Sequence, residues 1–382
     1  MTQQPQNLEA HPPGKRGARI AIFVSFSGQG GVERMMVNLA HGLSELGCSV
    51  DLVTVKSKSA YIDLLPKRIR RIDLKASHTF TSVLPLMAYL RKTRPAALLA
   101  AKDRANIVAV IARALVHRKA KLVLRMGTTV SAALGPHKAI KKRLWYLRMK
   151  IFYPMADSVI AVSKGVARDL MENAGLSGKL VTVVENPVVS PHLWEMAAQR
   201  PQHPWFASGQ PPVIVGVGRL TRQKDFPTLI RAFAKTRATI PCRLMILGDG
   251  RDREKLKFLA EELGVATDIH LAGFVKNPYP YIKHANLFVL SSAWEGSPNA
   301  LTEALALGTP VVSTDCPNGP REILQDGKFG ELVPIGDAEA MSRAMINTLS
   351  SPPEKSFLKS AIGRYTLESS CKRYMELLLD RN

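Results

Sequence analysis

The sequence predicts two α/β domains, each built on a parallel sheet. Three observations carry this prediction. Short apolar runs of strand type alternate with helix-type segments through both halves of the 382-residue chain. The first strand-type run turns into a helix through a glycine-rich loop. A proline-rich stretch with little periodicity, 187–212, separates the two halves. A chain of this length holds two domains of ordinary size.

We therefore expect the chain to divide into five segments. Residues 1–18 form a loose tail, 19–187 the first domain, 188–212 a linker, 213–355 the second domain and 356–382 a C-terminal helical segment. Its last helix is expected over Ser356–Leu379.

Charge and cysteine content narrow the class of protein. The net charge of +22 indicates an anionic partner: nucleic acid, an anionic membrane or a phosphorylated substrate. The hydrophobic content of 46% is typical of a globular protein. The four cysteines are far apart without metal-ligand spacing, which favours a reducing compartment. Residues 1–18 do not have the pattern of a signal peptide, and no run of about 18 apolar residues predicts a transmembrane helix.

The first half begins with a strand at Arg19–Phe26, a glycine loop and an amphipathic helix that Gly47 closes. The next strand is expected at Val50–Val55. The loop glycines either let the backbone approach a pyrophosphate or form no more than a tight turn. They are Gly28, Gly30 and Gly31. A nicotinamide-binding loop is disfavoured, because the spacing is not G-x-G-x-x-G and no acid ends the second strand; Lys56 and Lys58 stand there instead.

The rest of the first half continues the alternation. We expect a helix over Ser82–Arg94 and strands at Ala96–Ala101 and Lys121–Met126. Asp103 and Asn106 follow a strand end, so they either cap the next helix or line a cleft.

The most basic stretch is His137–Tyr153. Its six cations, from Lys138 to Lys150, are interleaved with apolar residues that include Leu144 and Trp145. If helical, the stretch either lies on an anionic membrane or is a solvated helix whose other face is in the core.

The second half opens with a strand at Val213–Val217, followed in the loop by Arg219 and Lys224. Two cations between a strand and a helix suit a diphosphate, although they also occur in loops for solubility. A further strand at Arg243–Leu247 leads into Gly248, Asp249 and Gly250, and another runs from Ile269 to Phe274.

The centre of the second half is a strand–loop–helix–strand unit. Leu287–Leu290 and Pro310–Ser313 are the strands, and Asn299–Leu307 is an Ala- and Leu-rich helix that Gly308 ends. The N-terminal end of such a helix binds anions, above all phosphate. Glu295 lies in the preceding loop and Glu303 in the helix, where a carboxylate accepts hydrogen bonds from sugar hydroxyls. A pair of acids at this spacing is common by chance, so the whole string carries more weight than the pair.

That string, WEGSPNALTEALALGTPVV, resembles the donor-site signature of family-four retaining glycosyltransferases, and DCPNGPREIL resembles its continuation. GGVERMMVNLAHGL and GRLTRQKDFPTLIRAF are similar to two further motifs of that family. The resemblance covers most of residues 19–345. It implies the GT-B fold, in which two Rossmann-like domains face each other across a cleft. The first domain would lie on the acceptor side, the second would bind the donor, and the last helix would cross back to the first domain.

The resemblance also implies roles for individual residues. Glu295 would lie beside the donor sugar, Arg219 and Lys224 would bind the donor diphosphate, and Glu303 would hold the ribose. The other donor-binding residues would be Gly30, Gly31, Gly248, Asp249, Gly250, Phe274, Ser297, Pro298, Asn299, Ala300 and Leu301. Gly127 stands where many members of the family have a histidine that contacts the sugar, so no catalytic histidine is expected.

The implied activity is transfer of a sugar, with retention of configuration, from a UDP- or GDP-sugar to a glycan or lipid-linked acceptor. The basic first domain suits a phosphorylated acceptor in lipopolysaccharide, exopolysaccharide or related glycan synthesis, at the cytoplasmic face of the membrane. We expect no permanently bound cofactor, no metal and no nucleic-acid partner. One alternative is a nucleotide-dependent enzyme of another class, such as an oxidoreductase, which the missing ribose-binding acid in the first half disfavours. The other is a non-catalytic nucleic-acid-binding protein, which would not explain Glu295, Glu303 and the two loop cations together.

Overall fold

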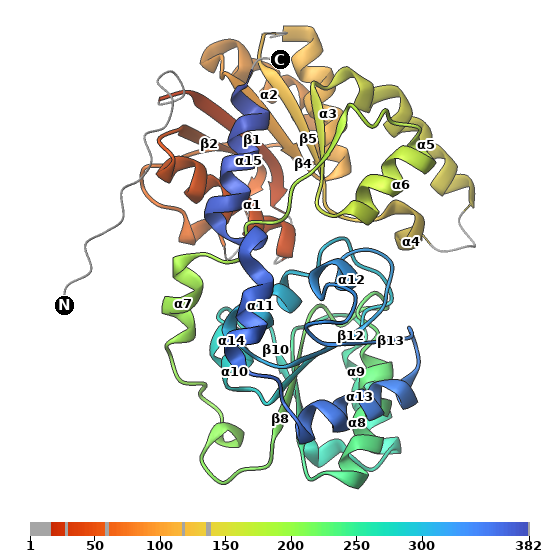
Figure 1. The fold of residues 1–382 in the computed structure, drawn as a ribbon. Helices are drawn as coiled ribbons and strands as arrows, with labels where there is room; N and C mark the ends of the chain where they lie inside the picture. Colours follow the sequence, from red (N-terminus) through yellow and green to blue (C-terminus); the bar gives the residue numbers. More distant parts are fainter. Residues whose placement is uncertain (1–16, 27–29, 58–60, 117–118, 135–138, 381–382) are drawn as a thin grey trace, which may run out of the picture.

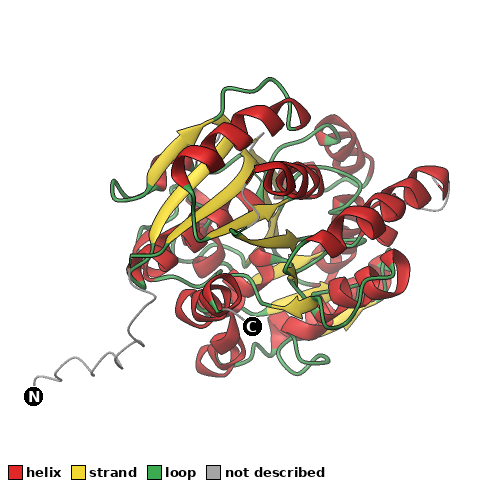
Figure 2. Ribbon diagram, turned by 90° about the horizontal axis from the view of Figure 1, so that it is seen from above, coloured by secondary structure: helices red, strands yellow, loops and turns green. Residues whose placement is uncertain are grey.

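A computed structural model describes residues 17–26, 30–57, 61–116, 119–134 and 139–380. Nearly all of the expected tail 1–18, together with Gly28 and Lys58, lies outside the described residues. The described chain forms two α/β domains, one above the other in Figure 1, each with a parallel sheet. Figure 2, turned by 90°, shows helices on either side of the strands. The predicted fold class is therefore confirmed.

Among the described residues, the first sheet has seven strands in the order β3-β2-β1-β4-β5-β6-β7. These are β1 (Arg19–Phe26), β2 (Ser49–Ser57), β3 (Arg70–Asp73), β4 (Ala97–Ala101), β5 (Lys121–Met126), β6 (Ser158–Ala161) and β7 (Val181–Val183). The helices are α1 (Gly31–Glu45), α2 (Val83–Thr93), α3 (Asp103–Val116), α4 (Val130–Leu134), α5 (Ala139–Phe152) and α6 (Lys164–Ala174).

Alternate residues of β1 pack against opposite layers, as the period of a strand requires. Ile20, Ile22 and Val24 lie in one core with residues of α1 and of the C-terminal helix α15 (Leu367–Leu379). Ala21 and Phe23 lie in a second core with residues of α2, α3, α5 and α6. Because both faces are covered, the strand is an apolar run, which is why it could be predicted from sequence.

The second sheet has the order β10-β9-β8-β11-β12-β13 in the described chain. Its strands are β8 (Val213–Val217), β9 (Arg243–Leu247), β10 (Ile269–Gly273), β11 (Leu287–Leu290), β12 (Val311–Thr314) and β13 (Glu331–Val333). Its helices are α8 (Phe226–Thr239), α9 (Arg253–Glu262), α10 (Tyr279–His284), α11 (Asn299–Leu307), α12 (Pro320–Ile323) and α13 (Ala338–Ser350). Both sheets therefore reverse their order beside a central strand, as in Rossmann-like folds.

Two expectations about the connecting segments are wrong. The stretch 188–212 is not a bare linker, since it holds α7 (Pro191–Ala197), whose Leu193 and Ala197 are buried in the core of the second domain. The expected single helix Ser356–Leu379 is instead α14 (Lys355–Lys359), a 3-10 segment over Ser360–Tyr365, and α15. The last of these returns to the first domain, where Leu367, Cys371 and Tyr374 join its core.

The two domains touch through polar contacts between loops and helix ends. The carboxylate of Glu322 in α12 accepts the backbone N–H groups of Lys164 and Gly165 at 2.9 and 3.0 Å, at the start of α6. Asn318 Nδ2 donates to Thr129 Oγ1 at 2.5 Å. A carboxylate at a helix N-terminus is a favourable charge–dipole contact, so Glu322 stabilises the relative position of the domains.

Candidate active site

The site lies where the strand order of the second sheet reverses, between β8 and β11. In open parallel sheets, ligands bind at the carboxyl ends of the strands at such a point. The loop after β8 carries Arg219 and Lys224, and the loop after β11 carries Glu295 and leads into α11. The topology thus brings together two motifs that lie some seventy residues apart in the sequence.

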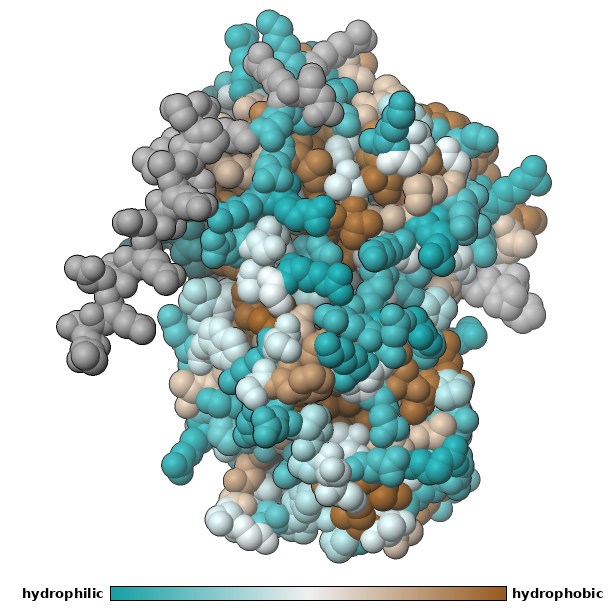
Figure 3. All heavy atoms as spheres, viewed as in Figure 1, coloured by the Kyte–Doolittle hydropathy of each residue, from teal (hydrophilic) through white to brown (hydrophobic). Residues whose placement is uncertain are grey.

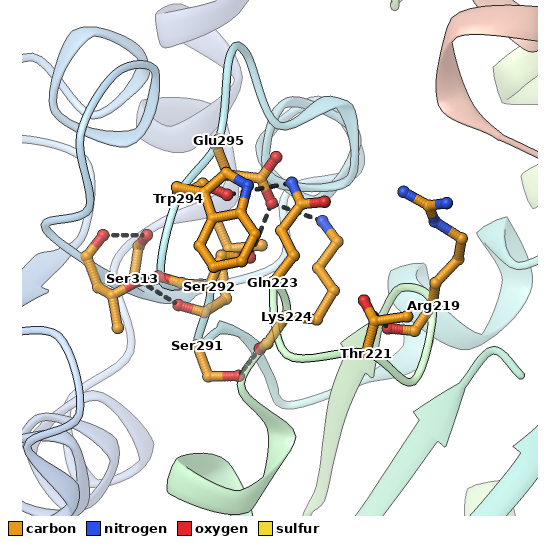
Figure 4. A network of polar contacts seen from close by, with 11 residues as sticks. Arg219, Thr221, Gln223, Lys224, Ser291, Ser292, Trp294, Glu295 and Ser313 are labelled. Carbon is orange, nitrogen blue, oxygen red and sulfur yellow. Dashed lines mark hydrogen bonds and ion pairs between the residues drawn. The ribbon is translucent and has the colours of Figure 1, made fainter. Parts of the chain in front are cut away.

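Lys224 and Glu295 form the centre of the site. Lys224 Nζ lies 2.6 Å from Glu295 Oε1, and Ser292 Oγ donates to the same oxygen at 2.7 Å. Ser291 Oγ donates to the carbonyl of Lys224 at 2.7 Å, which fixes the backbone of the loop after β8. Figure 4 shows the two charged side chains pointing toward each other. Because the Glu295 carboxylate is only 8% exposed and the lysine 18%, the pair is shielded from solvent.

Arg219 lies apart from this pair. It is exposed, and Figure 4 shows its guanidinium at a distance from Lys224 and Glu295, with no dashed line to either. The structure therefore brings together one of the two predicted phosphate-binding cations with Glu295 and leaves the other at the rim.

The N-terminal end of α11 faces the first domain. The Leu301 and Thr302 N–H groups donate to the carbonyl of Pro298, while the first N–H groups of a helix have no intrahelical acceptor. Asn299 Oδ1 accepts a hydrogen bond from Asn186 Nδ2 at 2.8 Å. A Cβ on Gly31 would lie 3.2 Å from Asn299 Nδ2, so the glycine lets α1 approach this helix end.

The other residues predicted for this helix end differ in how deeply they are buried. Ser297 and Ala300 are half-buried, whereas Pro298 and Leu301 are buried. Leu301 is part of the core of the second domain, so only its backbone is available to a ligand. A phosphate at this end would be bound by N–H groups and not by side chains.

Glu303 is fully buried and is paired across the domains. Its Oε1 accepts a short hydrogen bond from Arg34 Nη2 of α1, and its Oε2 has no partner among the described residues. The Arg34 guanidinium lies 6.0 Å from the centre of the Tyr61 ring and 5.5 Å from that of Tyr279. Burial alone would lower the pKa of Arg34, but Glu303 and the two tyrosines raise it above its ordinary value. The free carboxylate oxygen suits a hydroxyl donor, because an unsatisfied buried acceptor is costly.

Gly248 and Gly250 are required by the packing of two loops. Gly248 has φ 150°, and a Cβ there would lie 1.9 Å from the carbonyl oxygen of Gly218. A Cβ on Gly250 would lie 2.4 Å from the carbonyl oxygen of Leu220. Asp249 Oδ1 accepts the Gly250 N–H at 2.8 Å. Phe274 is 38% exposed at the end of β10. The glycines thus shape the loop after β8 that carries Arg219 and Lys224.

We expect Gly248→Ala to destabilise the second domain by roughly 1–3 kcal/mol or more, because the new methyl group would press on backbone that cannot move away. Thermal unfolding checks this. The matched control is Gly363→Ala, where a Cβ meets nothing within 4 Å and φ is not positive. Equal melting temperatures for the two variants would contradict the assigned packing role.

Sequence reasoning missed the partners that come from the other domain. Arg34 lies in the glycine motif, but nothing in the spacing indicates that it would reach Glu303. Thr129 Oγ1 donates to the carbonyl of Glu295 at 3.2 Å, and a Cβ on Gly296 would lie 2.4 Å from the carbonyl oxygen of Gly127. The cleft-lining interpretation of Asn106 is wrong, since it is fully buried and donates to Tyr153 Oη and the carbonyl of Arg125.

Comparisons with known proteins show which families and folds the chain resembles. The model of Glycosyltransferase Family 4 matches residues 29–190, and that of Glycosyl transferases group 1 matches residues 199–362. An uncharacterized glycosyltransferase of Methanocaldococcus jannaschii is 33% identical over 63% of this chain and 60% of its own length. The lipopolysaccharide core biosynthesis glycosyltransferase LpsE of Rhizobium meliloti is 34% identical over 44% of this chain and 50% of its own.

One relative is similar over most of both chains. It is the N-acetylgalactosamine-N,N'-diacetylbacillosaminyl-diphospho-undecaprenol 4-alpha-N-acetylgalactosaminyltransferase of Campylobacter jejuni, 29% identical over 86% of this chain and 89% of its own. Among solved structures, Anabaena HepE in complex with UDP and glucose has a TM-score of 0.75 at 20% identity, over 95% of this chain and 99% of its own. At that identity the likeness shows the fold alone.

The two parallel-sheet domains and their solved structural neighbours define the GT-B fold. The Glycosyltransferase Family 4 model and the Glycosyl transferases group 1 model together match more than four fifths of the chain, which supports a glycosyltransferase of the family-4 type.

Proposed function

We propose that this protein is a retaining glycosyltransferase that moves a sugar from a UDP- or GDP-sugar to a glycan or lipid-linked acceptor. The observation that carries the proposal is the Lys224–Glu295 ion pair, in which Glu295 lies four residues before Asn299, the first residue of α11. A lysine shielded from solvent, together with the first N–H groups of a helix, suits the binding of a diphosphate. The Campylobacter relative is named for an activity on a diphospho-undecaprenol-linked saccharide, which supports an acceptor of that class.

In this proposal the donor diphosphate lies at the N-terminal end of α11. Lys224 turns from Glu295 to the phosphates, and Arg219 closes on them from the rim. The positive charge offsets the charge that develops on the leaving diphosphate, so it contributes more in the transition state than in the ground state. Glu295, released from the lysine, lies beside the donor sugar. The free Oε2 of Glu303 accepts a hydrogen bond from a ribose hydroxyl.

The proposed donor-site roles of the remaining predicted residues are more limited. Gly30 and Gly31 would let the first domain close on the donor, as the approach of Gly31 to Asn299 supports. The loop Gly248–Gly250 and the exposed ring of Phe274 would contact the nucleotide base. In this proposal neither a metal ion nor a permanently bound cofactor takes part in sugar transfer.

The experiment that tests the proposed function is mass spectrometry of products formed from a panel of UDP- and GDP-sugars with polyprenyl-diphosphate-linked and lipopolysaccharide-core acceptors. The expected product is heavier than the acceptor by one sugar, with release of the nucleoside diphosphate. Consumption of donor by hydrolysis alone, with every acceptor unchanged, would contradict the transfer of sugar to these acceptors.

We further propose that the protein works on the inner face of the membrane and that α5 contacts the lipid. None of the helices in the described part of the chain is long and apolar enough to cross a bilayer. On α5, four exposed apolar residues recur at helical spacing: Ile140 (77% exposed), Leu144 (54%), Leu147 (49%) and Ile151 (56%). Such a stripe flanked by cations favours an interfacial position. Figure 3 shows hydrophilic and hydrophobic residues side by side at the right edge of the upper domain, where α5 lies in Figure 1.

One detail of the sequence interpretation of this helix is wrong. Trp145 is partly buried against the core of the first domain, next to Tyr146 and Met149, so it does not supply the outer apolar side. The exposed stripe takes that place, while Lys141, Arg143 and Arg148 are exposed beside it.

We expect changing Lys141, Lys142 and Arg143 together to Glu to release the protein from anionic vesicles. Each cation near such a surface contributes on the order of 1 kcal/mol, attenuated over a Debye length of about 8 Å. Co-sedimentation at low and rising salt measures this. The matched control changes Arg251, Lys255 and Lys257 to Glu, the same charge change on the second domain. Full vesicle binding by the α5 variant, or equal loss in the control, would sink the membrane assignment.

A further inference from the structure

A buried arginine behind the site has no role in the function proposed so far. Arg125, near the end of β5, is 1% exposed and is among the largest fully buried side chains. Its Nε donates to Tyr374 Oη at 3.0 Å, and its Nη2 donates to Asn186 Oδ1 at 2.5 Å. Both partners are neutral. Burying a guanidinium without a carboxylate is costly, so the position of this charge calls for an explanation.

The charge of Arg125 is not compensated within the described chain. No carboxylate lies within ion-pair distance of it there, and its Nη1 has no hydrogen-bond partner. Glu185, next to Asn186 in the sequence, is engaged elsewhere, with Arg373 at 3.5 Å and Arg364 at 4.0 Å. Arg125 is therefore a buried cation with one free donor group.

The free Nη1 group lies against Gly127, in the loop after β5. A Cβ on Gly127 would lie 3.0 Å from Arg125 Nη1, so the glycine leaves room for the guanidinium. The carbonyl of Gly127 in turn faces Gly296, the residue after Glu295. The guanidinium is thus separated from the loop that carries Glu295 by little more than the backbone of one glycine.

A chain of hydrogen bonds joins Arg125 to the proposed phosphate site. Asn186 accepts from Arg125 and donates through Nδ2 to Asn299 Oδ1 at 2.8 Å. Asn299 is the first residue of α11, whose N–H groups would bind the diphosphate. A charge in a low-dielectric interior acts over longer distances than one in water, so Arg125 does not need direct contact to stabilise an anion there.

We propose that Arg125 is a positioning residue of the donor site, whose uncompensated buried charge favours the donor diphosphate and whose link through Asn186 orients Asn299. This inference rests on the proposed function. Its distinctive consequence is that the contribution of Arg125 to nucleotide binding increases with the number of phosphates on the ligand.

The substitution Asn186→Asp tests the role of the Arg125 charge without replacing Arg125 itself. The aspartate still accepts from Arg125 and places a negative charge beside it, but it cannot donate to Asn299 as the amide does, so the lost bond needs its own control. Calorimetry compares uridine, UMP and UDP, and the same series of guanosine nucleotides. We expect little change for the nucleoside and a loss of about tenfold for the diphosphate, with the monophosphate between them. Arg125→Gln removes the positive charge itself. Its folded fraction should show the same pattern, in which the loss of affinity increases from the nucleoside to the diphosphate.

Two controls separate charge from geometry. Tyr374→Phe removes a hydrogen bond of Arg125 but keeps its charge, so it should leave the phosphate dependence unchanged. Asn299→Ala breaks the bond to Asn186 but leaves the charge of Arg125 uncompensated, so its loss of diphosphate affinity should be clearly smaller than that of Asn186→Asp. Diphosphate binding by Asn186→Asp as tight as in the unaltered protein would overturn this inference while leaving the proposed function intact. Failure of the unaltered protein to bind either nucleotide series would overturn both.

Discussion

Replacing Lys224 by methionine should lower kcat by roughly 10²–10³-fold, the range for removing one group that stabilises charge in a transition state. Lys224 is the shielded cation of the site, 2.6 Å from Glu295, and the charge on the leaving diphosphate grows as the glycosidic bond breaks. Steady-state kinetics with a saturating donor measures the effect. Arg219→Met should also lower kcat, but less, because its side chain is exposed and solvent screens it.

The control for this experiment is Lys235→Met. Lys235 pairs with Glu339 at 2.7 Å on the surface of the second domain, so its loss removes a lysine ion pair away from the cleft. Its kcat should stay within about twofold, since exposed pairs contribute about 0–1 kcal/mol. A Lys224→Met enzyme with normal kcat and only a raised KM would show that the lysine binds the donor without stabilising the leaving group.

Glu303→Gln should weaken nucleotide binding by roughly 10–100-fold, which corresponds to the loss of a charged hydrogen bond worth about 1.5–3 kcal/mol. The motivation is that Oε2 of this fully buried carboxylate has no hydrogen-bond partner among the described residues. Calorimetry with the nucleoside diphosphate measures the change. Because the substitution also removes the partner of Arg34, the melting temperature of the variant must be compared first.

A second ligand makes the test of Glu303 specific to the ribose. A 2',3'-dideoxy nucleotide lacks the hydroxyls that the carboxylate would bind, so the unaltered protein should bind it weakly. The Glu303→Gln variant should bind the dideoxy and the ordinary nucleotide about equally. If the variant still prefers the ordinary nucleotide by the same factor as the unaltered protein, Glu303 does not hold the ribose.

The fold was predictable where the sequence pattern is set by burial on both faces. β1, β5, β8 and β9 have the predicted bounds, since each is an apolar run between polar or glycine-rich turns. Helix α11 also has the predicted bounds, because Gly308 in the left-handed conformation ends it. α7 was missed because a seven-residue helix between prolines buries too few residues to show a period.

The C-terminal segment shows a signal that could have been used. Thr366 caps α15 by accepting the N–H of Ser369, and a threonine followed by helix formers is a start signal. The single-helix prediction ignored it, so the break before α15 was not foreseen.

The site was predictable within one domain but not across the two. Glu295 and Lys224 come from loops of one sheet, whose topology follows from the order of its strands. The pairing of Arg34 with Glu303 and the chain from Arg125 to Asn299 depend on how the domains face each other. No local sequence pattern encodes that arrangement, because Arg34 and Glu303, like Asn186 and Asn299, are more than a hundred residues apart. Arg125 and Asn186 are closer in sequence, but both lie in the first domain.

The most direct test of the central claim is the crystal structure of the protein with the nucleoside diphosphate that its active donor releases. The diphosphate oxygens should lie within about 3.2 Å of the backbone N–H groups of Asn299 and Ala300 and of Lys224 Nζ, with the ribose on Glu303. A nucleotide bound instead at the glycine loop of the first domain, with the Lys224–Glu295 pair unbroken, would contradict the account.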